Sequence, residues 1–198
     1  MSVMSVLYHG SDQKGLERII PQLSTHGKRY VYATKYPAIA LLFLCRWNDY
    51  LLTLETAMKE DRLQINLVER YPNAFEEIYA GNKGYIYTLK AEQFIHDPSC
   101  WDMELVSEHE EMPISCTEVS DVLAALKTLE GYDEISLYHY PKRPKSIPDD
   151  ESDLIDKSIE LYQLNGDLYN ARYCIEKFPH LRDRLAYRFK KEFNIDSL

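Results

Sequence analysis

Two short apolar runs near the N-terminus, LYHGS at residues 7–11 and YVYAT at residues 30–34, constrain the fold of this chain more than any other feature. Aromatic and β-branched residues favour strands. A strand whose apolar run ends in polar side chains delivers those side chains to a cleft. We therefore expect two early strands that serve one site.

The composition predicts a globular protein. The chain has 198 residues, of which 45% are hydrophobic and 28% charged. These values favour one large domain, or one domain with a helical extension. Its sixteen tyrosines suit half-buried strands and the walls of a cleft, because the ring is apolar and the hydroxyl polar.

Charge, cysteine content and hydropathy exclude several classes of function. A net charge of −9 repels phosphate backbones, so nucleic acid is not an expected partner. The four cysteines fit no CxxC spacing, so neither a zinc site nor a disulfide framework is predicted. No run approaches about 18 apolar residues and residues 1–4 carry no basic charge, so we expect no membrane span and a cytoplasmic location.

The pattern of elements predicts an α+β fold, because short strands and a few helices do not alternate regularly. Alternation and aromatic content predict strands over 3–8, 30–33, 63–68, 85–89, 101–106 and 111–117. Helical patterns cover a turn at 16–20, a buried helix at 38–45 that begins near Pro37, and 119–129.

Composition changes after residue 140. Three prolines and three positive charges at 141–148 predict a linker over 141–150. Beyond it, 153–164 and 180–193 have helical patterns. The expected organisation is an α+β domain at 1–140, a linker at 141–150 and a helical C-terminal extension at 151–198.

The order His-Gly-Ser, Tyr-Ala, apolar helix and late glutamate resembles the ADP-ribosyltransferase fold of diphtheria toxin and the poly-ADP-ribose polymerases. The resemblance covers residues 5 to about 125. That family carries a His-Tyr-Glu triad on three strands. The resemblance implies a split antiparallel β-sheet of ADP-ribosyltransferase type, with flanking helices and here a helical C-terminal extension.

The resemblance also implies how NAD would be held as a substrate, without a metal. His9 would bond the nicotinamide ribose and the Gly10 backbone the nicotinamide amide, where glycine allows close approach. Tyr32 would stack one face of the ring, with Phe43 or Tyr36 on the other. The whole predicted binding set is His9, Gly10, Ser11, Tyr32, Ala33, Tyr36 and Phe43.

The third triad member would be a late glutamate that stabilises an oxocarbenium-like state. Glu108, Glu110 and Glu111 are the candidates, and Glu110 is the first choice. With His9 and Tyr32 they form the predicted catalytic set.

The implied function is transfer of ADP-ribose from NAD to an unidentified acceptor, a protein or a small molecule, with release of nicotinamide. Two alternatives stay open. The same fold can be an inactive binding module, or the motif can be incidental in an α+β protein of another function. Taken alone, His9 also reads as a strand-end histidine that bonds a neighbouring backbone group.

Overall fold

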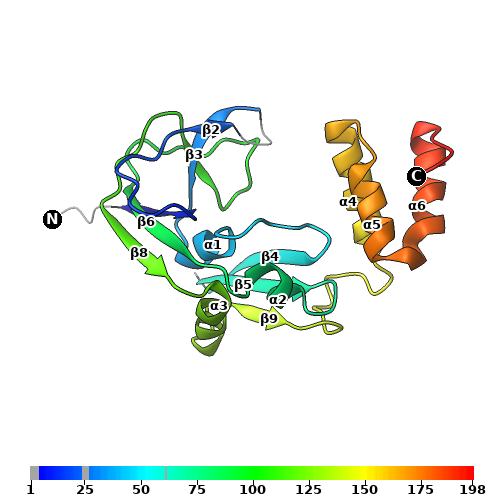
Figure 1. The fold of residues 1–198 in the computed structure, drawn as a ribbon, viewed down its shortest axis with the longest axis horizontal. Helices are drawn as coiled ribbons and strands as arrows, with labels where there is room; N and C mark the ends of the chain where they lie inside the picture. The colour runs from blue at the N-terminus through cyan, green and yellow to red at the C-terminus, as the bar shows by residue number, and fades with distance from the viewer. Residues whose placement is uncertain (1–4, 24–26, 61) are drawn as a thin grey trace. The chain divides into compact units, whose positions relative to one another are not determined.

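The computed structural model describes residues 5–23, 27–60 and 62–198 (Figure 1). Its contacts divide the chain into two compact units, which we describe separately. Unit 1 comprises Met1–Trp47, Thr56–Asn66 and Phe75–Leu137, and unit 2 comprises Asn48–Glu55, Leu67–Ala74 and Tyr138–Leu198. Unit 2 thus takes in 48–55 and 67–74, which the sequence analysis assigned to the first 140 residues. Residues 3–4 of the first predicted strand lie outside the described residues.

The first sheet of unit 1 has the order β1-β6-β8 and is antiparallel. It is formed by β1 (Val6–Ser11), β6 (Gly84–Lys90) and β8 (Ser115–Val119). Alternate residues of a strand share one face. The core-facing side of this sheet accordingly carries Leu7 from β1 and Tyr85, Tyr87 and Leu89 from β6.

A second antiparallel sheet, of order β2-β3-β7, adjoins β1. Its strands are β2 (Gln22–Leu23), β3 (Arg29–Ala33) and β7 (Leu105–Ser107). An isolated antiparallel bridge, Tyr8↔Thr34, joins the end of β3 to β1. The mixture of helices with these antiparallel sheets confirms the α+β class.

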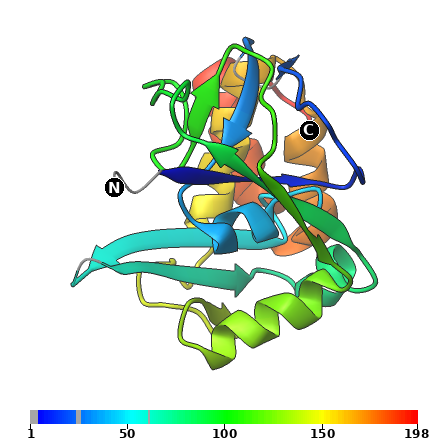
Figure 2. The ribbon, with the colours of Figure 1, turned by 90° about the vertical axis from the view of Figure 1, so that its left-hand side faces the viewer.

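Helix α1 (Pro37–Leu42) packs beside the first sheet, and α3 (Val122–Gly131) packs against α1. Helix α1 has proline in its first turn, and its residues from Ala38 to Leu42 are all buried. It contacts β1, β6 and α3, and Figure 2 shows α1 next to the β1 strand. The carboxylate of Asp121 caps α3 by accepting from the Ala124 N–H at 2.9 Å.

A third sheet, of order β4-β5-β9, contains strands that contribute residues to both units. Its strands are β4 (Leu52–Lys59), β5 (Arg62–Glu69) and β9 (Ser136–Tyr138). The short helix α2 (Ala74–Tyr79) follows β5. The sequence analysis predicted β5 but neither β4, α2 nor β9.

Unit 2 is built mainly from three helices around an apolar core. They are α4 (Ser152–Asn165), α5 (Tyr169–Lys177) and α6 (Arg182–Phe193), with the 3-10 turn η1 (Pro179–Leu181) before α6. They stand side by side in Figure 1. Their buried faces meet around Tyr50, Cys174, Phe178, Leu185 and Phe189. Among the residues described, no helix has the length and apolar character needed to cross a membrane.

Several predicted elements differ from the structure, and the helix predicted over 38–45 ends already at Leu42. Residues 16–20 form no helical turn, because Ile19 pairs with Glu111 in an isolated bridge. Residues 101–104 form a turn, so the predicted strand at 101–106 is reduced to β7. The strand predicted over 111–117 begins only at Ser115, beyond Pro113.

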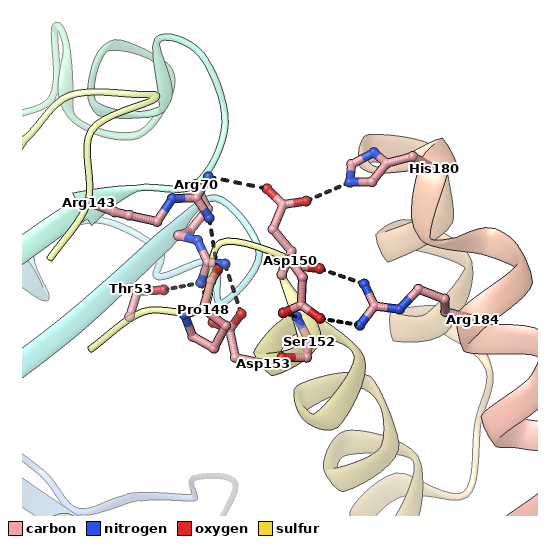
Figure 3. Close-up of polar contacts among 10 residues, drawn as sticks. Thr53, Arg70, Arg143, Pro148, Asp150, Ser152, Asp153, His180 and Arg184 are labelled. Atoms are coloured by element: carbon pink, nitrogen blue, oxygen red, sulfur yellow. Dashed lines mark hydrogen bonds and ion pairs between the residues drawn. The ribbon is translucent and has the colours of Figure 1, made fainter. Parts of the chain in front are cut away.

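Arg70 ties separate segments of unit 2 together (Figure 3). Its side chain is 1% exposed and donates to the Thr53 hydroxyl at 3.0 Å and to both carboxylate oxygens of Asp153, at 3.0 Å for Nη2. The same region holds a second pair, in which the Arg184 guanidinium meets the Asp150 carboxylate at 2.8 Å. A buried guanidinium depends on its partner, since an uncompensated charge in the interior is costly.

We expect Asp153→Asn to lower the free energy of unfolding by roughly 3 kcal/mol, because it leaves the buried Arg70 without its carboxylate. Urea unfolding followed by circular dichroism measures this. Asp156→Asn is the matched control on the same helix. It removes an exposed pair with Arg188, and the expected cost is below about 1 kcal/mol. Equal losses in the two variants would contradict the assignment.

Gly10 is required by the packing of α1 against β1. A Cβ atom added to Gly10 would lie 2.5 Å from the Ala40 carbonyl oxygen and 3.1 Å from a Leu44 methyl carbon. We expect Gly10→Ala to push α1 away and to destabilise the protein by about 1–3 kcal/mol. Thermal unfolding of Gly10→Ala tests this. Gly131→Ala is the control, since no atom lies within 4 Å of its added Cβ. A Gly10→Ala variant as stable as this control would be evidence against the close approach.

Candidate functional site

A pocket of about 270 Å³ opens in unit 1 beside β1, β3 and α1. Five residues of the predicted binding set line it, and they come from three separate elements. The lining residues are Tyr8, His9, Gly10, Tyr32, Ala33, Thr34, Ile39, Ala40, Phe43 and Glu104.

The pocket lies where β1 and β3 part after their bridge. Tyr8 and Thr34 exchange both backbone hydrogen bonds, at 2.8 and 2.9 Å. Because every second residue of a strand points its N–H and C=O to the same neighbour, the backbone groups of Gly10 face the same side as those of Tyr8. Past the bridge, the Gly10 N–H and C=O therefore border the pocket that Gly10 lines.

His9 is held in one orientation and in one tautomer. A carbonyl oxygen can only accept, so His9 Nδ1–H donates to the Tyr32 carbonyl oxygen at 2.7 Å. Burial lowers the pKa of His9, and the bond to the Tyr32 carbonyl opposes this only in part. The imidazole is therefore neutral at pH 7, and its Nε2 carries a lone pair that can accept a hydrogen bond. His9 thus makes the backbone hydrogen bond expected of a strand-end histidine, and it also lines the pocket.

Phe43 joins the pocket to an aromatic cluster that includes Trp47 and Trp101. Phe43, at the C-cap of α1, lines the pocket and is 42% exposed. Its ring centroid lies 5.5 Å from that of Trp47 and 6.3 Å from that of Trp101. Tyr32 also lines the pocket and packs edge-on against Tyr30 at 5.9 Å. Of the two candidates for the second stacking ring, Phe43 is the one in this pocket.

The carboxylate of the pocket belongs to Glu104, which the sequence analysis missed. Glu104 sits in a turn just before β7, where its N–H donates to the Trp101 carbonyl at 2.8 Å. One of its carboxylate oxygens accepts from the Trp101 N–H at 3.3 Å. The turn thus delivers Glu104 to the lining and Trp101 to the ring cluster. The available signal was a glutamate directly before the short apolar run at 105–106. It was missed because residues 101–106 were predicted to form one continuous strand.

Asp97 anchors the loop that leads to this turn. Its carboxylate accepts from the Tyr30 hydroxyl at 2.6 Å, from Lys28 Nζ at 2.9 Å and from the N–H and hydroxyl of Ser99 at 2.9 and 2.7 Å. Hydrogen bonds from Lys28, Tyr30 and Ser99 hold the pKa of Asp97 well below its usual range. Asp97 therefore stays charged at neutral pH and fixes the start of the loop against β3.

The remaining predicted site residues lie outside this lining. Ser11, at the end of β1, accepts from the Gln13 N–H at 3.2 Å. Tyr36 caps α1 and lines a different pocket, of about 710 Å³, with Tyr132.

The three late carboxylates predicted from sequence follow β7 and are not lining residues of the pocket. Glu108 is exposed. Glu110 forms an exposed pair with Arg18 at 3.0 Å. Glu111 is 7% exposed and accepts from the Ser107 hydroxyl at 2.6 Å, which is a structural contact. Glu104 precedes β7, so the strand separates it from all three.

Within the part of the chain that the structure describes, no group of three or more His, Cys, Asp and Glu side chains is arranged to hold a metal ion. The comparisons with known proteins give no family. No family model matches the chain, and neither curated proteins nor solved structures yield a significant match. The interpretation of the site therefore depends on the geometry of its residues.

The lowered pKa of His9 predicts a specific acid sensitivity. As the pH falls below the ordinary value of 6.5, the unfolded chain takes up a proton that the folded chain resists, so the free energy of unfolding decreases. We expect His9→Gln to reduce the loss of stability between pH 7.5 and pH 5.5. Urea unfolding at both pH values measures it, with the exposed His109→Gln as control. An unchanged pH dependence in His9→Gln would contradict the burial of this imidazole.

Proposed function

We propose that unit 1 is an NAD-binding domain of ADP-ribosyltransferase type, which transfers ADP-ribose to an acceptor and releases nicotinamide. The observation that supports this most is that His9, Gly10, Tyr32 and Phe43, predicted from the resemblance, line one pocket. They belong to three separate elements, β1, β3 and the end of α1. The acceptor is a protein or a small molecule.

In this proposal each residue has a role that its environment suits. The neutral His9 accepts a hydrogen bond from a ribose hydroxyl through Nε2, with its ring fixed by the Tyr32 carbonyl. The Gly10 N–H and C=O pair with the carboxamide of nicotinamide. The rings of Tyr32 and Phe43 stack the pyridine ring.

The pocket would hold one end of the dinucleotide. Its volume of about 270 Å³ lies below the roughly 300–1,000 Å³ that is typical of sites for whole ligands. A ring with its attached sugar is therefore the part that enters, and the rest of NAD lies outside the lining residues.

The chemical step breaks the bond between the ribose anomeric carbon and the nicotinamide nitrogen. The electron pair leaves with nicotinamide and neutralises its ring, while the sugar becomes an oxocarbenium ion. The Glu104 carboxylate stabilises that positive charge in the transition state. The acceptor then attacks the anomeric carbon and gives up its proton. Glu104 replaces Glu110 here as the proposed carboxylate.

The test compares two glutamates. We expect Glu104→Gln to lower the rate of nicotinamide release from NAD by about 10²–10³-fold, since it removes a charge aimed at the transition state. Glu110→Gln is the control, because Glu110 is exposed and outside the pocket. Chromatographic assay of nicotinamide, with water or arginine-rich peptides as acceptors, gives the rates.

Two outcomes would decide against the transferase. Absence of NAD binding by calorimetry would remove the proposal altogether. Binding of NAD without release of nicotinamide under any acceptor condition would leave the inactive binding module as the function of this fold.

A further inference from the structure

A second and larger pocket lies in unit 1, apart from the pocket beside β1 and β3. Its volume of about 710 Å³ is within the roughly 300–1,000 Å³ that is typical of small-ligand sites. Three segments line it, namely residues 36–38 at the start of α1, residues 59–60 and 62–65 where β4 meets β5, and residues 132–134 after α3. These elements can be followed in Figure 2. The two pockets have no lining residue in common.

The buried lining residues of this second pocket are apolar, and the charged ones are exposed. Ala38 and Ile65 are 5% and 3% exposed, and Leu63 is half-buried. The exposed charged residues of the lining are Lys59, Glu60, Arg62, Asp133 and Glu134. A ligand that fits here therefore has an apolar part to bury and charged groups to place at the opening.

Opposite charges reach the pocket from two different segments. Both cations come from the hairpin, where Lys59 ends β4 and Arg62 begins β5, and Glu60 is the carboxylate that lines the pocket beside them. The segment after α3 contributes carboxylates alone, those of Asp133 and Glu134. The C-terminus of a helix carries negative partial charge, which adds to the charge of these two residues.

The acidic segment is held in place by its backbone. The N–H groups of Asp133 and Glu134 both donate to carbonyl oxygens of the last turn of α3, at 3.0 Å. Among the residues that the structure describes, no ion pair joins Lys59 or Arg62 to these carboxylates. The opposite charges thus line one pocket without neutralising each other by direct contact, and a ligand with two charged ends can engage both.

We propose that this second pocket binds a short peptide with both ends free. The peptide carboxylate meets the hairpin cations, and its ammonium group meets the carboxylates after α3. An apolar side chain between the two ends covers Ala38 and Ile65, and the Gln64 amide of the lining can bond the peptide backbone. A single amino acid fits less well, because its charges are adjacent, whereas an extended tripeptide separates them by up to about 10 Å.

The inference goes beyond the proposed transferase and does not depend on it. The experiment uses four forms of the tripeptide Ala-Leu-Ala: the free peptide, its N-acetyl derivative, its C-terminal amide and the form blocked at both ends. Acetylation removes the ammonium charge and amidation the carboxylate charge, while the leucine side chain is kept. Calorimetry with the full-length chain gives the affinity of each form.

We expect each blocked end to weaken binding about threefold, and both blocked ends together about tenfold, as for exposed ion pairs. In the double variant Lys59→Gln/Arg62→Gln, amidation should lose its effect while acetylation keeps it. In Asp133→Asn/Glu134→Gln the reverse should hold.

Two exposed charges outside the pocket provide the matched controls. Lys127→Gln and Glu92→Gln should leave the effects of both blocking groups unchanged. Circular dichroism establishes that all variants are folded.

Equal affinities for the four forms, or no binding of the free tripeptide at millimolar concentration, would overturn the inference. Tighter binding of the amide than of the free peptide would also overturn it, because the pocket would then take a cation alone. Uniform weakening of all four forms in both double variants would limit these side chains to a structural role. Nicotinamide release from NAD is measured separately, so failure of either proposal leaves the other standing.

Discussion

The site depends on how β1 and β3 are joined. The bridge Tyr8↔Thr34 joins the two strands. If the strands stayed paired beyond this bridge, the Gly10 N–H and C=O would bond to β3 instead of bordering the pocket. The His9–Tyr32 hydrogen bond then spans the gap with a side chain instead of a backbone pair. This single hydrogen bond holds both the imidazole of His9 and the backbone of Tyr32 in place. A sheet split at this point is therefore the condition for a pocket between the strands.

Gly10 is subject to two requirements at the same position. Its backbone borders the pocket, while the site of its missing Cβ lies against the Ala40 carbonyl in α1. The sequence analysis explained this glycine by the approach of a ligand. The structure adds the approach of a helix, which alone is sufficient to require glycine here. Gly10 alone is therefore not evidence for a ligand. The argument for a binding site depends on His9, Tyr32 and Phe43, which line the pocket.

Local sequence patterns predicted those elements whose own residues favour the structure that they adopt. The aromatic and β-branched runs gave β1, β3 and β6, and Pro37 with its apolar run gave α1. Strand β4 was missed because Glu55, Ala57 and Lys59 favour helix, and its extended form depends on pairing within the sheet. Glu104 was missed for a related reason. Its place is set by a turn whose loop is anchored through Asp97 to Tyr30, a contact between residues far apart in sequence. The α+β class followed from the order of the elements, whereas the carboxylate of the site followed from tertiary contacts.

The Asp97 anchor and the Glu104 carboxylate illustrate how charge is distributed in this unit. Asp97 is almost fully buried, but four donated hydrogen bonds satisfy it and Lys28 balances its charge. Glu104 follows the turn that begins at Trp101 and lines the pocket. A carboxylate matched by a cation is used to hold a loop in place, and its field is largely cancelled at a distance. Asp97 therefore serves to hold a loop in place, whereas Glu104 lines the pocket together with Tyr32 and Phe43.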